Sequence, residues 1–415
     1  YALLSACEDR ANPIDQTEVR TLVEAELGAP LETLFPQFEA EPLAAASLAQ
    51  VHRAVSLDGE EVAVKVQYPK LQAQVRADLA TLRVLAWLLA RLEPDYGYEW
   101  LLPEFEASIL AELDFRMEAC NARRTAANFE RWPQLHVPEV VEHLSGRRVL
   151  TMEWIDGVKL TDADGLARRA IRGSECAALL SQAFSAMIFE FGFVHCDPHA
   201  GNLLARRMPR AQGGRAQLVL LDHGMYRRLS ANFRSEYCRL WMALLARDAR
   251  EGRAAARALG VEADDYETLS LLLTHRPPDS TAPTGSNMSA AERQAVRARY
   301  RSYGAAEVNT FLHRLPRDML FVMRTWSLVR SLNRRLGGTT RQRFMYISAA
   351  AARGALPDAL AAGSVSMGWI GRLLVCVRVQ YRLLRTSLLM HARDLVYRVH
   401  WRLWRIESYT SRQRG

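Results

Sequence analysis

The stretch that decides the fold is HCDPHAGN, residues 195–202, in which Asp197 stands five residues before Asn202. It follows a largely apolar helical pattern over residues 174–191 that ends at Gly192. This spacing suits a phosphoryl-transfer loop, in which Asp197 accepts a hydroxyl proton or orients a nucleophile and Asn202 offers its amide oxygen to Mg²⁺. Taken alone, an aspartate and an asparagine in a turn also serve as local hydrogen-bonding caps.

A second aspartate, Asp222, follows the apolar run at residues 218–221 and precedes His223 and Gly224. A strand-end aspartate with a flexible glycine two residues later is where a kinase holds the metal that bridges the phosphates. A solvated turn aspartate is the alternative. Beside HCDPHAGN, the pattern predicts that Asn202 and Asp222 are metal ligands.

Lys65 lies in the strand-like run VAVKV, residues 62–66. The chain has only two other lysines and otherwise uses arginine, so a retained lysine at this position favours a contact with nucleotide phosphates. An edge lysine in water is the alternative. The expected carboxylate partner lies in ELDFRMEA, residues 112–119, where Asp114 and Glu118 share a helix face and Glu112 points elsewhere. A solvated acidic helix face is the alternative for these residues.

The remaining periodicity predicts a strand-rich part with helices packed on it, followed by a largely helical part. An Asp-Gly hairpin turn at residues 57–60 joins strand-like runs 43–55 and 61–68, and short strand-like runs fall between residues 137 and 154. Other strands are expected at 203–205 and 217–221, and Ser230 is expected to cap a helix that ends near residue 244. Helical patterns cover residues 15–27, 71–92 and 101 to about 129.

An alanine-rich segment, residues 43–52, stands where a kinase carries its glycine-rich phosphate loop. Alanine restricts the left-handed backbone conformations that let glycine loops fold over phosphates. The sequence also lacks the GxxxxGK pattern of P-loop proteins. An ordinary P-loop is therefore excluded.

In order and approximate spacing, AAASLAQVH, VAVKVQYP, ELDFRMEA, HCDPHAGNLL and LDHG resemble the motifs of the UbiB (aarF-domain) family of atypical kinases, over about residues 15–240. The resemblance implies that Lys65 contacts phosphates and pairs with Glu118, that Asp197 is the catalytic aspartate, and that Asn202 and Asp222 bind the metal. It implies a nearby ExD motif at Glu112 and Asp114. The remaining residues assigned to ATP binding are Ala44, Ala45, Ala46, Ser47 and Glu153.

Three departures from the family pattern stand out. The family's KxGQ motif is absent, and we interpret the chain, which starts at Tyr1, as a piece of a longer precursor. Ala49 stands where many members have glycine, and His223 replaces the usual phenylalanine after the metal aspartate.

The choice of acceptor is addressed by the segment after Asp222. Residues 223–229 are too few for a long activation segment, and no APE-like anchor follows. His199, two residues after Asp197, also resembles the loop of aminoglycoside and choline kinases. A small molecule, a lipid head group or water is therefore expected as acceptor, and protein kinase activity is not expected.

Composition limits the class of partner. The net charge of +8 favours anionic partners, and we rank an anionic lipid or membrane surface above nucleic acid, which is not expected. The apolar pattern at residues 363–406 is interrupted by arginines and is too charged to span a bilayer, so it either packs on the protein or lies on a membrane surface. The six cysteines are far apart and are expected to be reduced.

The sequence thus predicts an α+β, bilobal protein-kinase-like fold with a helical C-terminal extension, and ATP and Mg²⁺ as ligands. The predicted segments are an N-lobe at 1–152, a C-lobe at 153–275, a flexible linker at 276–292 and the extension at 293–415. The resemblance implies kinase or ATPase activity linked to coenzyme Q or lipid metabolism and a mitochondrial, membrane-associated location. A pseudokinase-like regulatory or lipid-binding module without turnover is the alternative.

Overall fold

The computed structural model describes residues 14–45, 48–92, 102–209, 213–277, 280, 288–301 and 305–355. The chain divides into two compact units. The first unit comprises Tyr1–Ile171 and His199–Tyr226, and the second comprises Arg172–Pro198 and Arg227–Gly415. The α+β class expected from the sequence is confirmed, whereas the predicted lobe boundaries stay a prediction.

The first unit contains an antiparallel sheet in the order β1-β3-β4-β6, and β2 pairs with the N-terminal half of β3 along the same edge as β1. Its hairpin forms at the expected Asp-Gly turn, where Gly59 has φ +80°, a conformation that favours glycine. The strands are β1 (Gln37–Phe38), β2 (Ala44–Ala45), β3 (Ala49–Val55), β4 (Glu61–Gln67) and β6 (Val149–Glu153).

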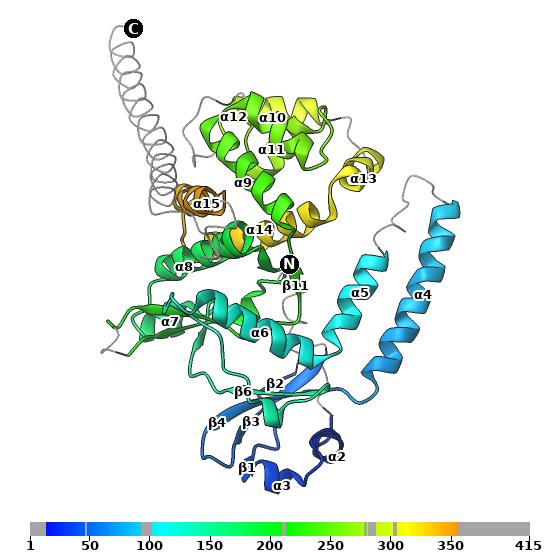
Figure 1. The fold of residues 1–415 in the computed structure, drawn as a ribbon, viewed down its shortest axis with the longest axis vertical. Helices are drawn as coiled ribbons and strands as arrows, with labels where there is room; N and C mark the ends of the chain where they lie inside the picture. Colours follow the sequence, from blue (N-terminus) through cyan, green and yellow to red (C-terminus); the bar gives the residue numbers. More distant parts are fainter. Residues whose placement is uncertain are drawn as a thin grey trace, which may run out of the picture. The chain divides into compact units, whose positions relative to one another are not determined.

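Strand alternation gives this sheet two different faces. Val62, Val64 and Val66 of β4 are at most 1% exposed and pack in one core with residues of α2 (Gln16–Leu27) and α3 (Leu31–Leu34). Ala63 faces the other way, toward the cluster that includes Phe115 and Ala119 of α6 (Phe115–Phe129). In Figure 1 the sheet accordingly lies between α2 and α3 on one side and α6 on the other.

The helix expected over residues 71–92 forms as α4, whereas the next expected helix differs from the prediction. The single long helix expected over residues 101–129 is wrong, because it breaks into α5 and α6. Asp114 has extended backbone angles and accepts a hydrogen bond from the N–H of Arg116, so it caps α6 instead of continuing α5. The bounds are α4 (Leu71–Leu92), α5 (Leu102–Glu112), α7 (Ala163–Arg168) and the one-turn η3 (Glu142–Leu144).

A second sheet in the first unit has the order β5-β10-β9-β7. The hairpin of β9 and β10 pairs Leu203 with Leu220, which places the two predicted metal-binding segments at the same end of this hairpin. A short helical turn, η5 (Ala200–Asn202), leads into β9. The strands are β5 (Leu135–His136), β7 (Val158–Lys159), β9 (Leu203–Arg207) and β10 (Ala216–Leu220).

The second unit is mostly helical around an aromatic core. The apolar pattern at 174–191 forms α8 and then η4, a π-helix that ends at Gly192 with φ +59°. Gly354 of α15 is required where that helix meets η4, because a Cβ on Gly354 would lie 1.8 Å from the carbonyl oxygen of Phe189. Phe189 also stacks on Tyr237 with ring centroids 5.4 Å apart.

The second unit's helices are α8 (Gly173–Ser185), η4 (Ala186–Phe191), α9 (Ala231–Ala246), α10 (Ala249–Ala258), α11 (Tyr266–Thr274), α12 (Ala290–Arg299), α13 (Ala305–Arg314), α14 (Arg317–Arg335) and α15 (Thr340–Gly354). Its short sheet joins β8 (Phe193–His195) and β11 (Tyr226–Arg228). Ser230 caps α9 as expected. The predicted linker includes the first turn of α12, whereas most of its remaining residues and the arginine-containing pattern at 363–406 lie outside the described residues.

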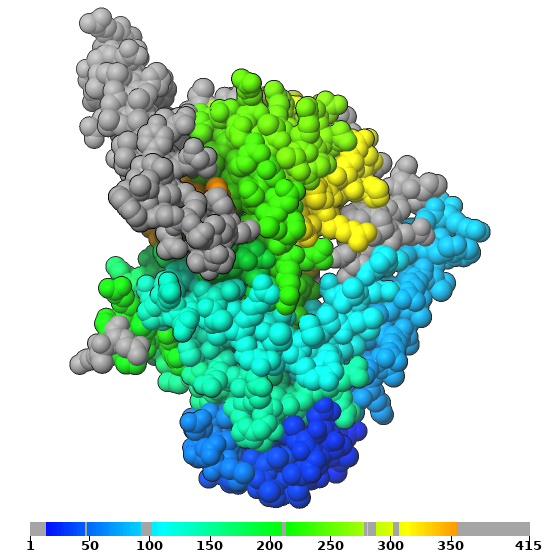
Figure 2. All heavy atoms as spheres, in the orientation of Figure 1, coloured from blue at the N-terminus to red at the C-terminus, as the bar shows by residue number. Residues whose placement is uncertain are grey.

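Two observations concern contact with membranes: the exposed apolar side chains of α4 and the apolar character of the helices. Large apolar side chains are exposed along α4, including Val84, Trp87 and Leu92, and α4 lies open at the surface in light blue in Figure 2. Within the described residues, none of the helices combines the length and the apolar character needed to cross a membrane.

Candidate active site

Lys65 is held by Glu118 in the first unit. Lys65 is on the face of β4 that points toward α6, and its Nζ donates to both carboxylate oxygens of Glu118, at 2.9 and 3.0 Å. The side chains are 14% and 4% exposed. The pairing expected from the sequence is therefore present, and Glu118 rather than Glu112 is the partner.

Asp222 is a second carboxylate on the same lysine. The Nζ of Lys65 also donates to Oδ2 of Asp222 at 3.0 Å, a contact that the sequence did not predict. The other oxygen, Oδ1, accepts from the backbone N–H of Gly224 at 2.9 Å. Asp222 is one-third exposed, so the cluster opens to water on this side.

The electrostatics of this trio favour a charged lysine. Burial opposes the charge on Lys65, but Asp222 and Glu118 outweigh burial and raise the pKa of Lys65 above its usual value. Burial, together with the charge of Asp222, raises the pKa of Glu118 above its usual value, although Lys65 acts to lower it. The ring of Phe115 lies 5.1 Å from Nζ and adds a cation–π contact. With both carboxylates ionised, the trio carries a net charge of −1.

Helix α6 also fixes the loop that follows β10. The backbone N–H of His223 donates to Oε1 of Glu118 at 3.3 Å, and Nδ2 of Asn121, one turn later on α6, donates to the carbonyl of His223 at 3.0 Å. The buried ring of His223 contacts the hydroxyl of Tyr226 at 2.9 Å and the carbonyl of Leu220 at 3.1 Å. Through these contacts, the buried His223 fixes the loop next to Asp222.

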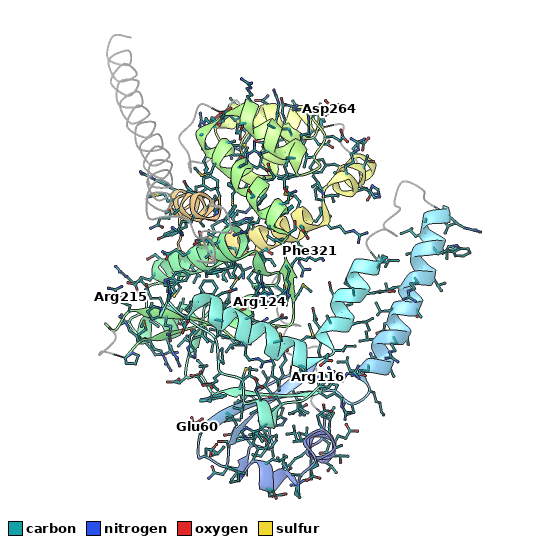
Figure 3. All side chains as sticks on the ribbon, in the orientation of Figure 1. Glu60, Arg116, Arg124, Arg215, Asp264 and Phe321 are labelled. Carbon is teal, nitrogen blue, oxygen red and sulfur yellow. The ribbon has the colours of Figure 1, made fainter. Side chains whose placement is uncertain are left out.

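The ExD residues lie in different environments. Glu112 is beside the Asp222 loop, because a Cβ built on Gly224 would lie 3.5 Å from Cγ of Glu112. Asp114 instead pairs with Arg116, at 2.9 Å to Nε and 2.6 Å to Nη2, and Arg116 lowers the pKa of Asp114 (Arg116 is labelled in Figure 3).

Asn202 is next to the Asp222 segment through the backbone. Its carbonyl accepts from the N–H of Leu221 at 2.9 Å, so Asn202 is opposite the residue that precedes Asp222. His199 caps the turn before it, with Nδ1 accepting from the N–H of Gly201 at 3.3 Å.

Asp197 belongs to the second unit, where it follows β8. Its backbone N–H donates to Nδ1 of His195 at 3.2 Å, and its Oδ1 accepts from Nη2 of Arg324 on α14 at 3.3 Å. The side chains of Asp197 and Arg324 are 38% and 51% exposed. The sequence did not predict Arg324, because 127 positions separate it from Asp197 and no pattern links the two.

Helix α14 is fixed in the second unit by Arg227. The Nε of Arg227 donates to Asp318 at 2.8 Å, and the guanidinium of Arg227 lies 5.0 Å from the ring centre of Phe321, which is labelled in Figure 3. The neighbouring Cys196 is buried, and burial raises the pKa of its thiol to about 12. Burial therefore disfavours the thiolate form of Cys196. Cys196 and the other three described cysteines are free in the structure.

The remaining residues assigned to ATP binding are only partly described. Ala44 and Ala45 form β2 and pair with Val51 and Gln50, whereas residues 46 and 47 lie outside the described residues. Glu153 ends β6 and accepts from Nε2 of His136 at 2.7 Å. Burial opposes ionisation of Glu153, but the hydrogen bond from His136 and the backbone N–H of Glu139 hold its pKa below the usual value.

The Lys65–Glu118 pair makes a stability prediction. Lys65→Met is expected to lower the free energy of unfolding by about 3–5 kcal/mol, because it leaves two facing carboxylates without their cation. Glu118→Gln should cost less, since Asp222 still contacts Lys65. Urea unfolding of the single and double variants should show a coupling of about 1–3 kcal/mol.

A matched control for this cycle is Glu130→Gln, an exposed glutamate at the end of the same helix, which should be additive with Lys65→Met within about 0.5 kcal/mol. Coupling of Lys65 to Glu112 in place of Glu118 would contradict the assignment.

Comparison with known proteins gives the family. The ABC1 atypical kinase-like domain matches residues 6–255. AarF domain-containing protein kinase 1 of Gallus gallus is 38% identical over 331 residues, which are 79% of this chain and 63% of that protein. A putative ABC1 protein of Arabidopsis thaliana is 35% identical over 378 residues, 86% and 70% of the two chains. This chain thus spans about 63% of the length of its chicken relative.

A solved structure supports the fold. The complex of Rv3197 with erythromycin from Mycobacterium tuberculosis aligns with a TM-score of 0.56 and 23% identity, over 83% of this chain and 85% of that chain. The likeness concerns the fold alone. Because the matching domain covers more than half of the sequence and the Arabidopsis relative is covered over 70% of its length, the chain belongs to the ABC1 (aarF-domain) family of atypical kinases, as its motifs predicted.

Proposed function

We propose that this chain binds ATP with Mg²⁺ and transfers the γ-phosphoryl group to a small or lipid-like acceptor or to water. The observation that carries the proposal is the buried Lys65 with Glu118 and Asp222 at 2.9–3.0 Å from its Nζ. A charged, pre-oriented ammonium of this kind is suited to the α and β phosphates. Membership of a family of atypical kinases supports the same proposal.

Lys65 keeps one partner and exchanges the other in this proposal. Glu118 is almost wholly buried and receives the N–H of His223, so it stays in place and positions the ammonium. Asp222 is more exposed and would supply an oxygen ligand to Mg²⁺, which would leave Nζ of Lys65 able to contact a phosphate oxygen. The two carboxylates then serve different ligands.

The residues present fit a magnesium ion that arrives with the nucleotide. In the described ranges no cluster of three or more histidine, cysteine, aspartate or glutamate side chains could hold a metal without other ligands. Mg²⁺ needs no such cluster, because it usually keeps several waters and binds one or two carboxylates plus substrate phosphates. The carboxylate of Asp222 and the amide of Asn202 would supply oxygen ligands to such an ion.

Asp197 has the role of base or orienting group for the acceptor. It stands five residues before Asn202, so the chain itself keeps the two within about 18 Å whatever the conformation. Bound Mg²⁺ neutralises the phosphate charge that develops during transfer. Asp197 accepts the proton of the attacking hydroxyl or water, and Nη2 of Arg324 contacts its Oδ1 in this structure.

The setting of this activity follows from family resemblance alone. We propose a link to coenzyme Q or lipid metabolism, a mitochondrial location and association with an anionic membrane surface. The net charge of +8 supports the last of these proposals. The second candidate is a pseudokinase that binds nucleotide without turnover. It is favoured by the contact of Arg324 with Asp197, which occupies the proposed base.

The test is the magnesium dependence of nucleotide binding. Asp222→Asn is expected to weaken MgATP binding by about 10- to 100-fold, because one of the two metal ligands loses its charge, and not to weaken metal-free ATP binding, because Lys65 loses a competing carboxylate. Thermal shift and calorimetric titration measure both. Asp78→Asn, an exposed aspartate of α4, is the matched control and should change neither. Equal stabilisation by MgATP and metal-free ATP would contradict the metal assignment.

A further inference from the structure

A cavity of about 200 Å³ lies within the second unit, among helices α9, α11, α14 and α15. None of the residues proposed for nucleotide binding lines it. The exposed Ser327 and Leu272 form part of its lining, so the cavity reaches the surface. It can therefore admit a ligand from solution.

One wall of the cavity is aromatic. Trp241 lies with its ring centre 6.0 Å from that of Phe344 and 6.3 Å from that of Trp326, and all three rings line the space. Met323 and Ile347 add further apolar surface. An apolar cavity of about 150 Å³ is enough to bind benzene in another protein. The space here suits one ring or a short acyl chain.

The same cavity is lined by two arginines. Arg343 is 5% exposed, and its guanidinium has neither a hydrogen bond nor a carboxylate within ion-pair distance among the described residues; its ring contact is with Phe344, at 5.5 Å. Arg330 donates from Nη1 to His275, and its Nε is buried without a hydrogen-bond partner in the described structure. Among the residues that the structure describes, these two cations thus share an apolar space without an anion.

This arrangement is electrostatically unfavourable as it stands. Burial lowers the pKa of Arg343 to about 10, and the charges of Arg330 and Arg334 contribute smaller parts of this decrease. Burial and Arg334 lower the pKa of Arg330. His275 provides no compensating charge, because desolvation and the nearby arginines lower its pKa to about 4 and leave it neutral. An unpaired buried charge is destabilising, and a bound anion would offset that cost.

We propose that this cavity binds a small organic anion, a carboxylate or phosphate monoester carried on a single ring or a short acyl chain. The anionic group contacts Arg343 and Arg330, and the apolar body packs against Trp241, Trp326 and Phe344. Arginine suits both anions because its planar fork matches their oxygens. The inference does not depend on the nucleotide proposal, since the two involve different residues.

The test is a titration of the whole chain with matched probes. Benzoate, hexanoate and phenyl phosphate should bind, with benzamide and hexanol, which have the same bodies without the charge, at least tenfold weaker. Acetate and inorganic phosphate, which have the charge without the body, should also be at least tenfold weaker. Comparison of benzoate with phenyl phosphate identifies the preferred anion. Equal binding of the neutral probes, or of inorganic phosphate alone, would overturn the proposal.

Variants distinguish a binding arginine from a structural one. Arg343→Met should weaken benzoate binding at least tenfold while the ligand-free Tm stays the same or rises, because an uncompensated charge is removed. A lower Tm with unchanged affinity would overturn the proposal. Arg335→Met, at the exposed end of α14, is the matched control and should leave affinity unchanged.

A second variant avoids the core. Ser327→Trp places a large ring at the exposed rim and should block all the organic probes while the fold is retained. Unchanged binding of benzoate by a folded Ser327→Trp protein would place the ligand elsewhere and contradict the assignment.

Discussion

Asp197→Asn is expected to lower the rate of ATP turnover by about 10²- to 10⁴-fold and to leave MgATP affinity within about twofold of the parent. The asparagine keeps the shape of the side chain but cannot accept the proton of the attacking hydroxyl or water, and general-base catalysis contributes a factor of this size. Affinity should hold because Lys65, Asn202 and Asp222 are unchanged. Steady-state phosphate release and calorimetric binding separate the two effects.

Loss of fold would not explain such a result. The ion pair of Asp197 and Arg324 is exposed on both sides, and pairs of this kind contribute about 0–1 kcal/mol. The exposed Asp264, labelled in Figure 3, gives the control Asp264→Asn, which should change neither rate nor affinity. If the parent binds MgATP but shows no turnover that depends on Asp197, the pseudokinase reading is correct.

Arg324 adds an internal comparison to this experiment. Because it contacts the proposed base, Arg324→Met should alter the turnover of the parent but have no effect in the Asp197→Asn background. Equal effects in both backgrounds would mean that Arg324 acts independently of Asp197.

The Lys65–Glu118 pair could be predicted because each residue sits in a regular element with a clear period. Alternation of the buried valines in β4 fixes the face on which Lys65 lies, and a family motif points to Glu118. The hairpin around Gly59 and the cap at Ser230 follow from local chemistry in the same way.

The contacts that sequence reasoning missed depend on tertiary packing. The break between α5 and α6 has helix-compatible residues on both sides, and Asp114 becomes a cap because the N–H of Phe115 bonds to the carbonyl of Arg147, 32 positions away. The link of Lys65 to Asp222 spans 157 positions. Of these contacts, only that of Asn121 could have been found from the sequence. Asn121 follows Glu118 by one helical turn and therefore lies on the same face of α6.

The last prediction concerns the acceptor: this chain should not phosphorylate generic protein substrates, even if it turns over ATP. Only residues 223–229 separate Asp222 from Ser230, the cap of α9, and three residues of this segment belong to β11. No platform for a peptide comparable to a long activation segment fits in that length. Positioning a hydroxyl in line with the phosphate contributes about 7–11 kcal/mol to a reaction, so transfer to an unpositioned peptide should be negligible.

Radiolabelled ATP distinguishes the acceptors of this prediction. Casein, histone and a random peptide library should be labelled only at background, and Asp197→Asn should lower that background no further. Phosphate release and labelling of small phenols or phospholipid head groups should depend on Asp197. Robust labelling of peptides that disappears with Asp197→Asn would contradict the prediction, because it would require a peptide-binding surface built from residues other than 223–229.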